Sequence, residues 1–208
     1  MRQFSFITLF FASLFLSHAQ NNEASIDEAI QEFVMTLPQE ASSSMFSVKR
    51  YCNGSVKMFM MNNGSQCITN GDYIEAYLFF KQNDSVWVKK FDNCGSFKKL
   101  ALEDSAAFEH FTTNIDSIGK QEVKPFKTAQ ESTQPLARAT VYRCHRSFAF
   151  YNKEEITTQT YSLYALSNEG LQPNINYDYN NALNMVTLDA MLDPVLSKAQ
   201  ENNSFKRN

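Results

Sequence analysis

Apolar residues recur every three or four positions over residues 25–37, and this period predicts an amphipathic helix at Ser25–Leu37. Ser25 and Glu28 have the spacing of a capping box, and Pro38 ends the helix. The polar face carries no basic residue, so we expect the helix to cover a sheet rather than to bind a membrane or a partner.

Alternation with a period of two predicts strands over the next seventy residues. The clearest hairpin joins Tyr73–Lys81 to Val86–Phe91 through a turn at Asn83–Asp84. We expect the face with Tyr77, Phe79 and Val88 to be half covered or to line a cavity. In the register that this turn sets, Phe80 faces Trp87 and Ala76 faces Phe91.

Two Asn-Gly pairs punctuate the chain before that hairpin. Asn53–Gly54 separates Val48–Cys52 from Ser55–Met61, and Asn63–Gly64 follows. Asn-Gly suits the type I′ turn, in which both central residues need positive φ. We therefore expect a three-stranded meander.

The middle of the chain alternates between the two periods. Phe97–Leu102 fits a further strand, and Ser105–Ile118 fits a second helix that Gly119 ends. Gln121–Ala137 has two prolines and few apolar residues, which is typical of a long loop. Arg138–Tyr151 and Ile156–Leu166 then form another predicted hairpin.

The C-terminal pattern is less decisive. Ile175–Asp189 fits either two short strands around Asn180–Asn181 or the approach to a helix. Asp189–Gln200 fits a helix in which Pro194 is a kink or a fresh start. We expect residues 201–208 to form a flexible tail.

Together these elements predict an α+β fold in one domain over residues 20–200. Its mostly antiparallel, aromatic-rich sheet would be covered by the N-terminal helix and by the second helix near residues 105–118. The chain has 18 phenylalanines and 9 tyrosines, which suits a packed sheet.

The first nineteen residues have the parts of a signal peptide. Arg2 precedes an apolar run at Phe4–Leu16, and Ser17-His18-Ala19 supplies small residues at a cleavage site. We expect cleavage after Ala19 and a secreted or periplasmic mature protein. No later apolar run is long enough to span a bilayer, so we expect no stable membrane insertion.

The formal net charge of −3 argues against nucleic acid as a partner, because phosphate binding needs a dense positive surface. The sequence has no metal-ligand spacing and no phosphate-binding glycine motif, so we expect no metal and no cofactor.

An even number of cysteines in an exported chain predicts disulfides. In the expected meander, Cys52 lies at one end of the sheet, while Cys67 and Cys94 lie at the other. About five strand residues, on the order of 16 Å, would then separate Cys52 from Cys67. A disulfide joins Cα atoms no more than about 7 Å apart. We therefore favour Cys67–Cys94 with Cys52–Cys144 over pairing between nearest neighbours.

Two groups of polar residues are candidates for chemistry. Arg143, His145 and Ser147 share one face of a predicted strand, where a carboxylate, phosphate or sulfated ligand would fit. A solvated strand face explains the same residues. Around the second helix, acids and a histidine suit acid–base work, although helix capping explains the acids as well. This second group consists of Glu103, Asp104, Glu109 and His110.

The sequence contains none of the common catalytic motifs, and it favours a non-enzymatic binding or interaction module. The expected partner is a small molecule or a protein. The alternative is a small exported hydrolase-like enzyme that uses His145 with Ser147 or a nearby carboxylate.

Overall fold

The computed structural model describes residues 23–69, 71–129, 144–152, 155–169 and 172–208. The expected signal peptide lies outside these ranges, as do residues 130–143, which include part of the predicted loop and strand. The described chain has a mixed α+β fold with an antiparallel sheet, as predicted. Its helical segments are α1 (Glu23–Met35), α2 (Gln39–Ser42), α3 (Ala106–Thr113), α4 (Ile115–Ile118), η1 (Leu163–Leu166), α5 (Tyr177–Asn181) and α6 (Asn184–Glu201).

The main sheet has seven strands, ordered β6-β5-β4-β1-β8-β9, with β7 also paired to β5. A separate two-stranded sheet consists of β2 and β3. The strands are β1 (Ser44–Cys52), β2 (Met58–Met60), β3 (Gln66–Ile68), β4 (Ile74–Gln82), β5 (Ser85–Asp92), β6 (Gly95–Ser96), β7 (Leu100–Ala101), β8 (Cys144–Asn152) and β9 (Glu155–Ser162).

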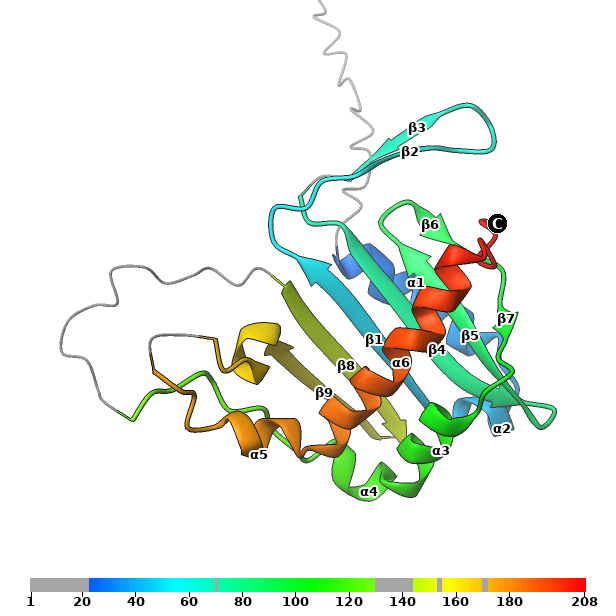
Figure 1. The fold of residues 1–208 in the computed structure, drawn as a ribbon. Coiled ribbons are helices and arrows are strands. Elements are labelled where there is room, and N and C mark those ends of the chain that lie inside the picture. Colours follow the sequence, from blue (N-terminus) through cyan, green and yellow to red (C-terminus); the bar gives the residue numbers. More distant parts are fainter. Residues whose placement is uncertain (1–22, 70, 130–143, 153–154, 170–171) are drawn as a thin grey trace, which may run out of the picture.

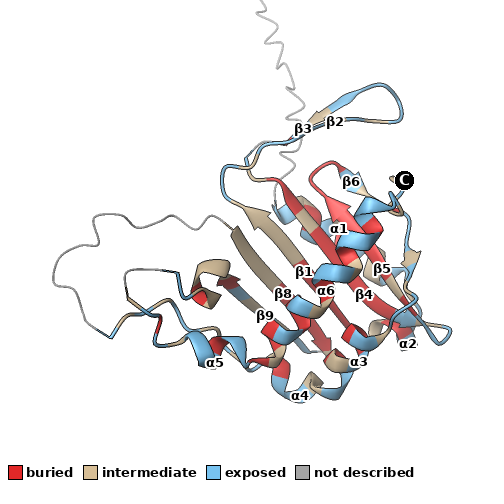
Figure 2. Cartoon of the chain, viewed as in Figure 1, coloured by how far each residue is buried: buried red, intermediate tan, exposed pale blue. Residues whose placement is uncertain are grey.

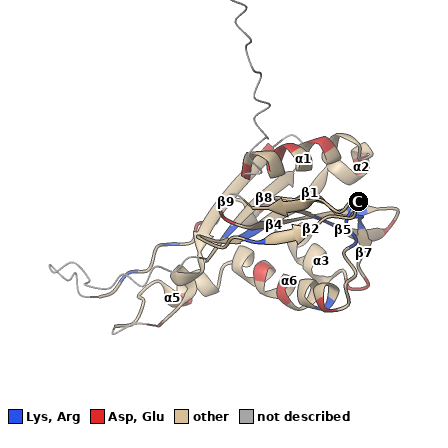
Figure 3. Ribbon diagram, turned by 90° about the horizontal axis from the view of Figure 1, so that it is seen from above, with Lys and Arg blue, Asp and Glu red and all other residues tan. Residues whose placement is uncertain are grey.

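Helices cover both faces of the main sheet (Figure 3). One face packs against α3 and α6, where Phe46 stacks on Phe79 at 4.7 Å between ring centroids. The other face packs against α1, where Phe33 lies 5.7 Å from Phe80. Tyr77 and Phe79 are therefore fully buried, rather than half covered as the sequence suggested. Figure 2 shows the resulting buried centre in β4 and β5.

The central hairpin has the predicted register. Phe80 pairs with Trp87, and Ala76 pairs with Phe91. Asn83 and Asp84 both have positive φ, at 52° and 58°, as a type I′ turn requires.

The Asn53–Gly54 hairpin is wrong. β1 pairs with β4 and β8, not with β2. Phe46 and Val48 are fully buried, so β1 needs long neighbours on both sides, which a three-residue exposed strand does not offer. At both Asn-Gly pairs only the glycine has positive φ, and Gly64 lies in the β2–β3 connection.

Two helix predictions also need correction. α1 begins at Glu23, so Ser25 lies inside the helix and does not form a capping box. The second helix divides into α3 and α4 at Asn114, whose side chain donates to the His110 carbonyl at 2.8 Å. The ambiguous segment after residue 175 is helical, and α6 continues through Pro194.

Where the sequence predicts a flexible tail, residues 202–208 lie along the β5–β6 edge. Arg207 donates two hydrogen bonds to Asp92, at 2.8 and 2.7 Å, and the Asp92 side chain is fully buried. Phe205 contacts the Tyr77 ring at 5.8 Å. A buried carboxylate needs a cationic partner, and this partner comes from the end of the chain.

The structure contains the favoured disulfides, Cys52–Cys144 and Cys67–Cys94. The reason is different from the one expected, because all four cysteines lie at the same end of the sheet. Cys52 and Cys144 are directly opposed on β1 and β8, whereas Cys94 follows β5. Lateral position in the sheet, not strand length, keeps Cys52 from Cys67.

Candidate functional site

The predicted polar site is an ordered strand face. His145 and Ser147 lie on the same face of β8. The His145 ring stacks on Tyr51 at 5.2 Å, and the Thr160 hydroxyl donates to Ser147 Oγ at 2.9 Å. Among the described residues, no hydrogen bond joins His145 to Ser147. Arg143 lies outside the described residues, so ligand binding by this group stays a prediction.

The acidic group near α3 is explained by local structure. Asp104 Oδ1 accepts a hydrogen bond from the Ala106 amide at 2.8 Å, at the start of the helix. His110 Nε2 lies 3.0 Å from the carbonyl oxygen of Asn184 on α6. These contacts hold α3 and α6 in place, and they leave His110 directed at a backbone group rather than at a carboxylate.

A buried cluster of charges joins α6 to the sheet. Arg50 and Arg146, paired across β1 and β8, contact the Asp189 carboxylate at 2.7 and 3.0 Å. Tyr161 donates to the same carboxylate at 3.0 Å, and Asp193 binds Arg50 at 2.7 Å. Burial raises the pKa of Tyr161, as does the neighbouring Asp189, so the hydroxyl stays protonated. Two acids balance two guanidinium groups, which indicates a structural contact rather than an anion site.

The β2–β3 hairpin leaves the main sheet at the end where the four cysteines lie, and it projects beyond that end (Figure 1). Its inner face is fixed to the body of the molecule at three points. Cys67 is bonded to Cys94, the Phe59 ring lies 5.3 Å from Tyr73, and the Arg207 guanidinium lies 5.5 Å from Phe59. A short two-stranded hairpin is marginally stable alone, so these contacts define its position.

The hairpin is largely exposed to solvent (Figure 2). Its outer face is mainly apolar, with one polar residue, Gln66, paired with Met60. Alternation places Met58 and Met60 on the face opposite Phe59. Lys57 is the only charged residue in 54–69, and its ammonium lies over the Tyr73 ring at 4.2 Å. We call the four exposed side chains the hairpin stripe: Val56 (61% exposed), Met58 (62%), Met60 (66%) and Ile68 (58%).

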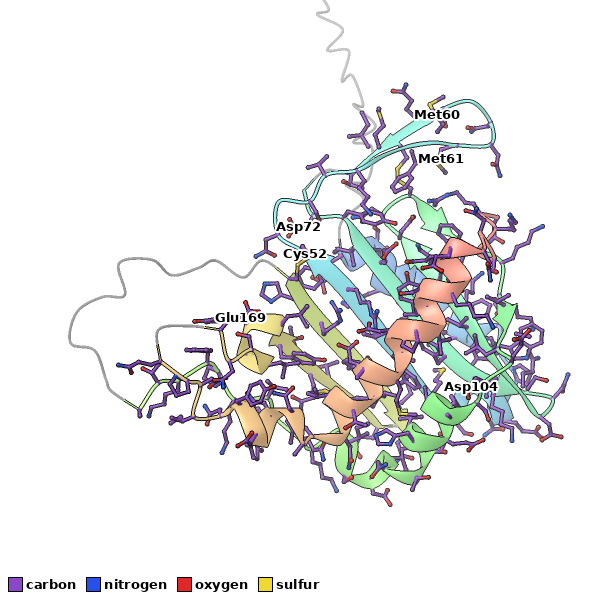
Figure 4. All side chains as sticks on the ribbon, in the orientation of Figure 1. Cys52, Met60, Met61, Asp72, Asp104 and Glu169 are labelled. Atoms are coloured by element: carbon purple, nitrogen blue, oxygen red, sulfur yellow. A yellow bond between two sulfur atoms is a disulfide. The ribbon has the colours of Figure 1, made fainter. Side chains whose placement is uncertain are left out.

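A groove of about 340 Å³ lies between α6 and the segment 100–104, and we call it the α6 groove. Charged groups lie at its edge: Asp104 is labelled in Figure 4, and Lys198 binds Glu103 at 3.3 Å with both side chains exposed. The apolar part of its lining consists of Leu100, Ala101, Leu102, Met191, Pro194, Val195 and Ala199.

The hairpin stripe was not predicted from the sequence. The signal was present, because Val56, Met58 and Met60 alternate with polar or inward residues between two Asn-Gly pairs. The same alternation fits one face of a covered strand, and the outward direction depends on Cys67 bonding to Cys94. The α6 groove depends on a contact between segments about ninety residues apart, which no local pattern reveals.

Comparisons with known proteins gave no match: neither protein-family models, nor curated proteins, nor solved structures resemble the chain closely enough to identify a relative. In the described ranges, no helix has both the length and the hydropathy needed to cross a membrane.

Proposed function

We propose that this chain is an exported, non-enzymatic binding module that contacts a protein partner through the hairpin stripe. The observation that supports it most strongly is the stripe itself. Four apolar side chains, each more than half exposed, lie on a hairpin that projects beyond the main sheet and that a disulfide fixes to the body of the molecule. Exposed apolar patches on otherwise polar surfaces mark interaction sites.

The chemistry of the hairpin favours a protein over a lipid surface. Its tip, Asn62–Gln66, is polar and uncharged. The part of the hairpin that would enter a bilayer first is therefore not apolar. The stripe has no basic residue for anionic headgroups, which interfacial membrane segments use. Methionine adapts to irregular apolar surfaces on a partner.

Rigidity adds to the argument. The Cys67–Cys94 bond and the Phe59–Tyr73 contact fix the hairpin before it meets a partner. A segment that is already ordered loses less conformational entropy on binding, so more of the contact energy contributes to affinity.

The proposal includes export. Cleavage after Ala19 would release the mature chain into a secreted or periplasmic location, and two disulfides fit an oxidising compartment. The hydrolase-like alternative requires His145 to engage Ser147 or a carboxylate, whereas the described contact of His145 is with Tyr51.

The test introduces negative charges into the hairpin stripe. A Met58→Glu, Met60→Glu double variant should lose its partner, because desolvating two carboxylates in an apolar interface is costly. The control is Ile156→Glu, at a 51% exposed position on β9. The tagged proteins are recovered from the exported fraction of the producing cells, and the size of the native complex is measured. Titration with the purified partner then gives the affinity of each protein.

We expect wild type and Ile156→Glu to migrate in the same complex and the double variant to migrate alone. Equal complex formation by all three proteins would contradict the hairpin as the binding surface.

A further inference from the structure

We propose that Asn63, at the tip of the β2–β3 hairpin, is the acceptor of an N-linked glycan. This inference rests on one part of the proposed function, the export of the chain, and not on the hairpin stripe as a binding surface. Asn63-Gly64-Ser65 is an Asn-x-Ser sequon whose middle residue is not proline. In exported proteins the glycans on such sequons lie at the surface.

The asparagines of this chain divide into two groups. The chain has four sequons, and the asparagine of each is exposed: Asn53, Asn63, Asn83 and Asn202. The buried asparagines are Asn93, Asn174 and Asn180, none of which begins a sequon. Their Nδ2 atoms donate to backbone carbonyls at 3.3, 3.0 and 2.8 Å. The sequons therefore fall on asparagines that are accessible, and not on those that hold the fold together.

The tip of the hairpin has room for an oligosaccharide. The Gly64 amide donates to the Met61 carbonyl at 2.9 Å, which closes the turn and places Asn63 at its outer end. No atom lies within 4 Å of the position that a Cβ would take on Gly64. The hairpin also projects beyond the main sheet (Figure 1), so a glycan on its tip points away from the body of the molecule.

The side chain of Asn63 presents the reactive nitrogen. Its Oδ1 accepts hydrogen bonds from the Ser65 amide at 2.9 Å and from the Ser65 hydroxyl at 2.6 Å. No hydrogen bond in the described part of the chain occupies its Nδ2. The carboxamide is thus held by its oxygen, while the nitrogen that takes the sugar is open to solvent.

The transfer needs one co-reactant, a lipid-linked oligosaccharide of the secretory compartment. Nδ2 of Asn63 attacks C1 of the first sugar, and a C–N bond forms as the C–O bond to the lipid pyrophosphate breaks. The pyrophosphate leaves with the electron pair, and Nδ2 gives up one proton. The reaction is a group transfer in which nothing is oxidised or reduced.

A glycan at this position would affect which partners the hairpin can meet. An N-linked glycan is bulky and hydrated, and here it would lie beyond the end of the stripe. It would keep the tip out of a bilayer while leaving the side chains of Met58 and Met60 uncovered on the outer face. Glycosylation of Asn63 is therefore compatible with a protein partner for the stripe.

The experiment is mass spectrometry of the chain recovered from the exported fraction of the producing cells. The peptide that contains Asn63 is measured before and after an amidase that cleaves the bond between asparagine and sugar. Because Asn-Gly pairs also deamidate spontaneously, the evidence is the intact glycopeptide and not the aspartate that remains. Four variants accompany wild type: Asn63→Gln, Ser65→Ala, Ser65→Thr and Asn62→Gln, the last at an exposed neighbour outside any sequon.

We expect wild type to carry a glycan on Asn63 that the amidase removes. Asn63→Gln and Ser65→Ala should lose it, whereas Ser65→Thr and Asn62→Gln should keep it, and circular dichroism verifies that every variant is folded. An exported wild-type chain with unmodified Asn63 would overturn the inference and leave the proposed function standing. A glycosylated chain whose stripe variant still binds the partner would contradict the proposed function alone. A chain that retains residues 1–19, stays in the cell and lacks the glycan would contradict both.

Discussion

Asp189 is the residue on which the attachment of α6 to the sheet most depends. Its side chain is 8% exposed and contacts Arg50, Arg146 and Tyr161. Removing one member of a buried ion pair is costly, because the opposite charge stays buried without compensation.

Asp189→Asn should therefore lower the free energy of unfolding by about 3–5 kcal/mol, as expected for a buried pair broken on one side. Asp193→Asn is the matched control: it removes a 57% exposed carboxylate that binds the same Arg50. That change should cost about 0–1 kcal/mol. Urea denaturation measures both, and equal losses would contradict the assignment of Asp189 as the central acid.

Glu75 gives the fold a dependence on pH. Burial alone would raise the pKa of Glu75, but the Lys90 ammonium at 2.6 Å, with Lys57 and the Tyr73 hydroxyl, lowers it below 4.5. A carboxyl whose folded-state pKa is depressed stabilises the fold above its unfolded value. That stabilisation is lost as the pH falls through the folded-state pKa.

Glu75→Gln should therefore be less stable than wild type at neutral pH, by about 1–3 kcal/mol for a lost, partly buried ionic hydrogen bond. It should also lose less stability than wild type between neutral pH and acid. Denaturation curves at a series of pH values test this, with Glu103→Gln at a 91% exposed position as control. If the unfolding free energy of Glu75→Gln fell toward acid pH as steeply as that of wild type, Glu75 would not be a source of the pH dependence.

Residue contacts divide into those that sequence reveals and those that it hides. Phe80 and Trp87 were paired correctly, because the turn at Asn83–Asp84 fixes the register locally. The contact of Arg207 with Asp92 joins residues 115 positions apart, and no local sequence pattern near either residue predicts it. The charge cluster around Asp189 is also non-local, because Arg50 lies 139 positions and Arg146 43 positions from Asp189 in the sequence.

At the scale of elements, the hairpin and its disulfide form one unit. Replacing Cys67 and Cys94 by serine should free β2 and β3 from the body. In the chain-entropy model, removing this disulfide lowers the free energy of unfolding by about 3–4 kcal/mol. The main sheet should remain, because neither of the two buried cores includes a hairpin residue.

Limited proteolysis checks this outcome. The double serine variant should be cut within residues 56–68 while the rest of the described chain resists. A variant lacking Cys52–Cys144 should not gain this cleavage, because that bond joins β1 to β8. A hairpin that stays resistant without Cys67–Cys94 would show that its other contacts suffice.

Element prediction failed where tertiary context overrides local preference. Asn53–Gly54 has the composition of a tight hairpin, yet β1 extends back to Ser44 and is buried between β4 and β8. The period of two identified the strand correctly. It carried no information about which strand lies beside it.

At the scale of the whole molecule, patterning predicted the class of fold, because alternation constrains the whole chain. The favoured disulfide pairs are present, but they were predicted from a meander that the structure does not contain. Site prediction turned toward Arg143, His145 and Ser147 because polar residues on a strand stand out in a sequence. The hairpin stripe stands out only in space, since exposed methionines resemble core methionines until the fold shows what covers them.

The central claim is that the outer face of the hairpin contacts another protein, and photo-crosslinking from residue 60 tests it most directly. A photoreactive amino acid replaces Met60 in the exported chain, and the same substitution at Ile156 is the comparison. We predict a discrete covalent adduct from position 60 and none from position 156. No adduct from position 60, or the same adducts from both positions, would contradict the claim.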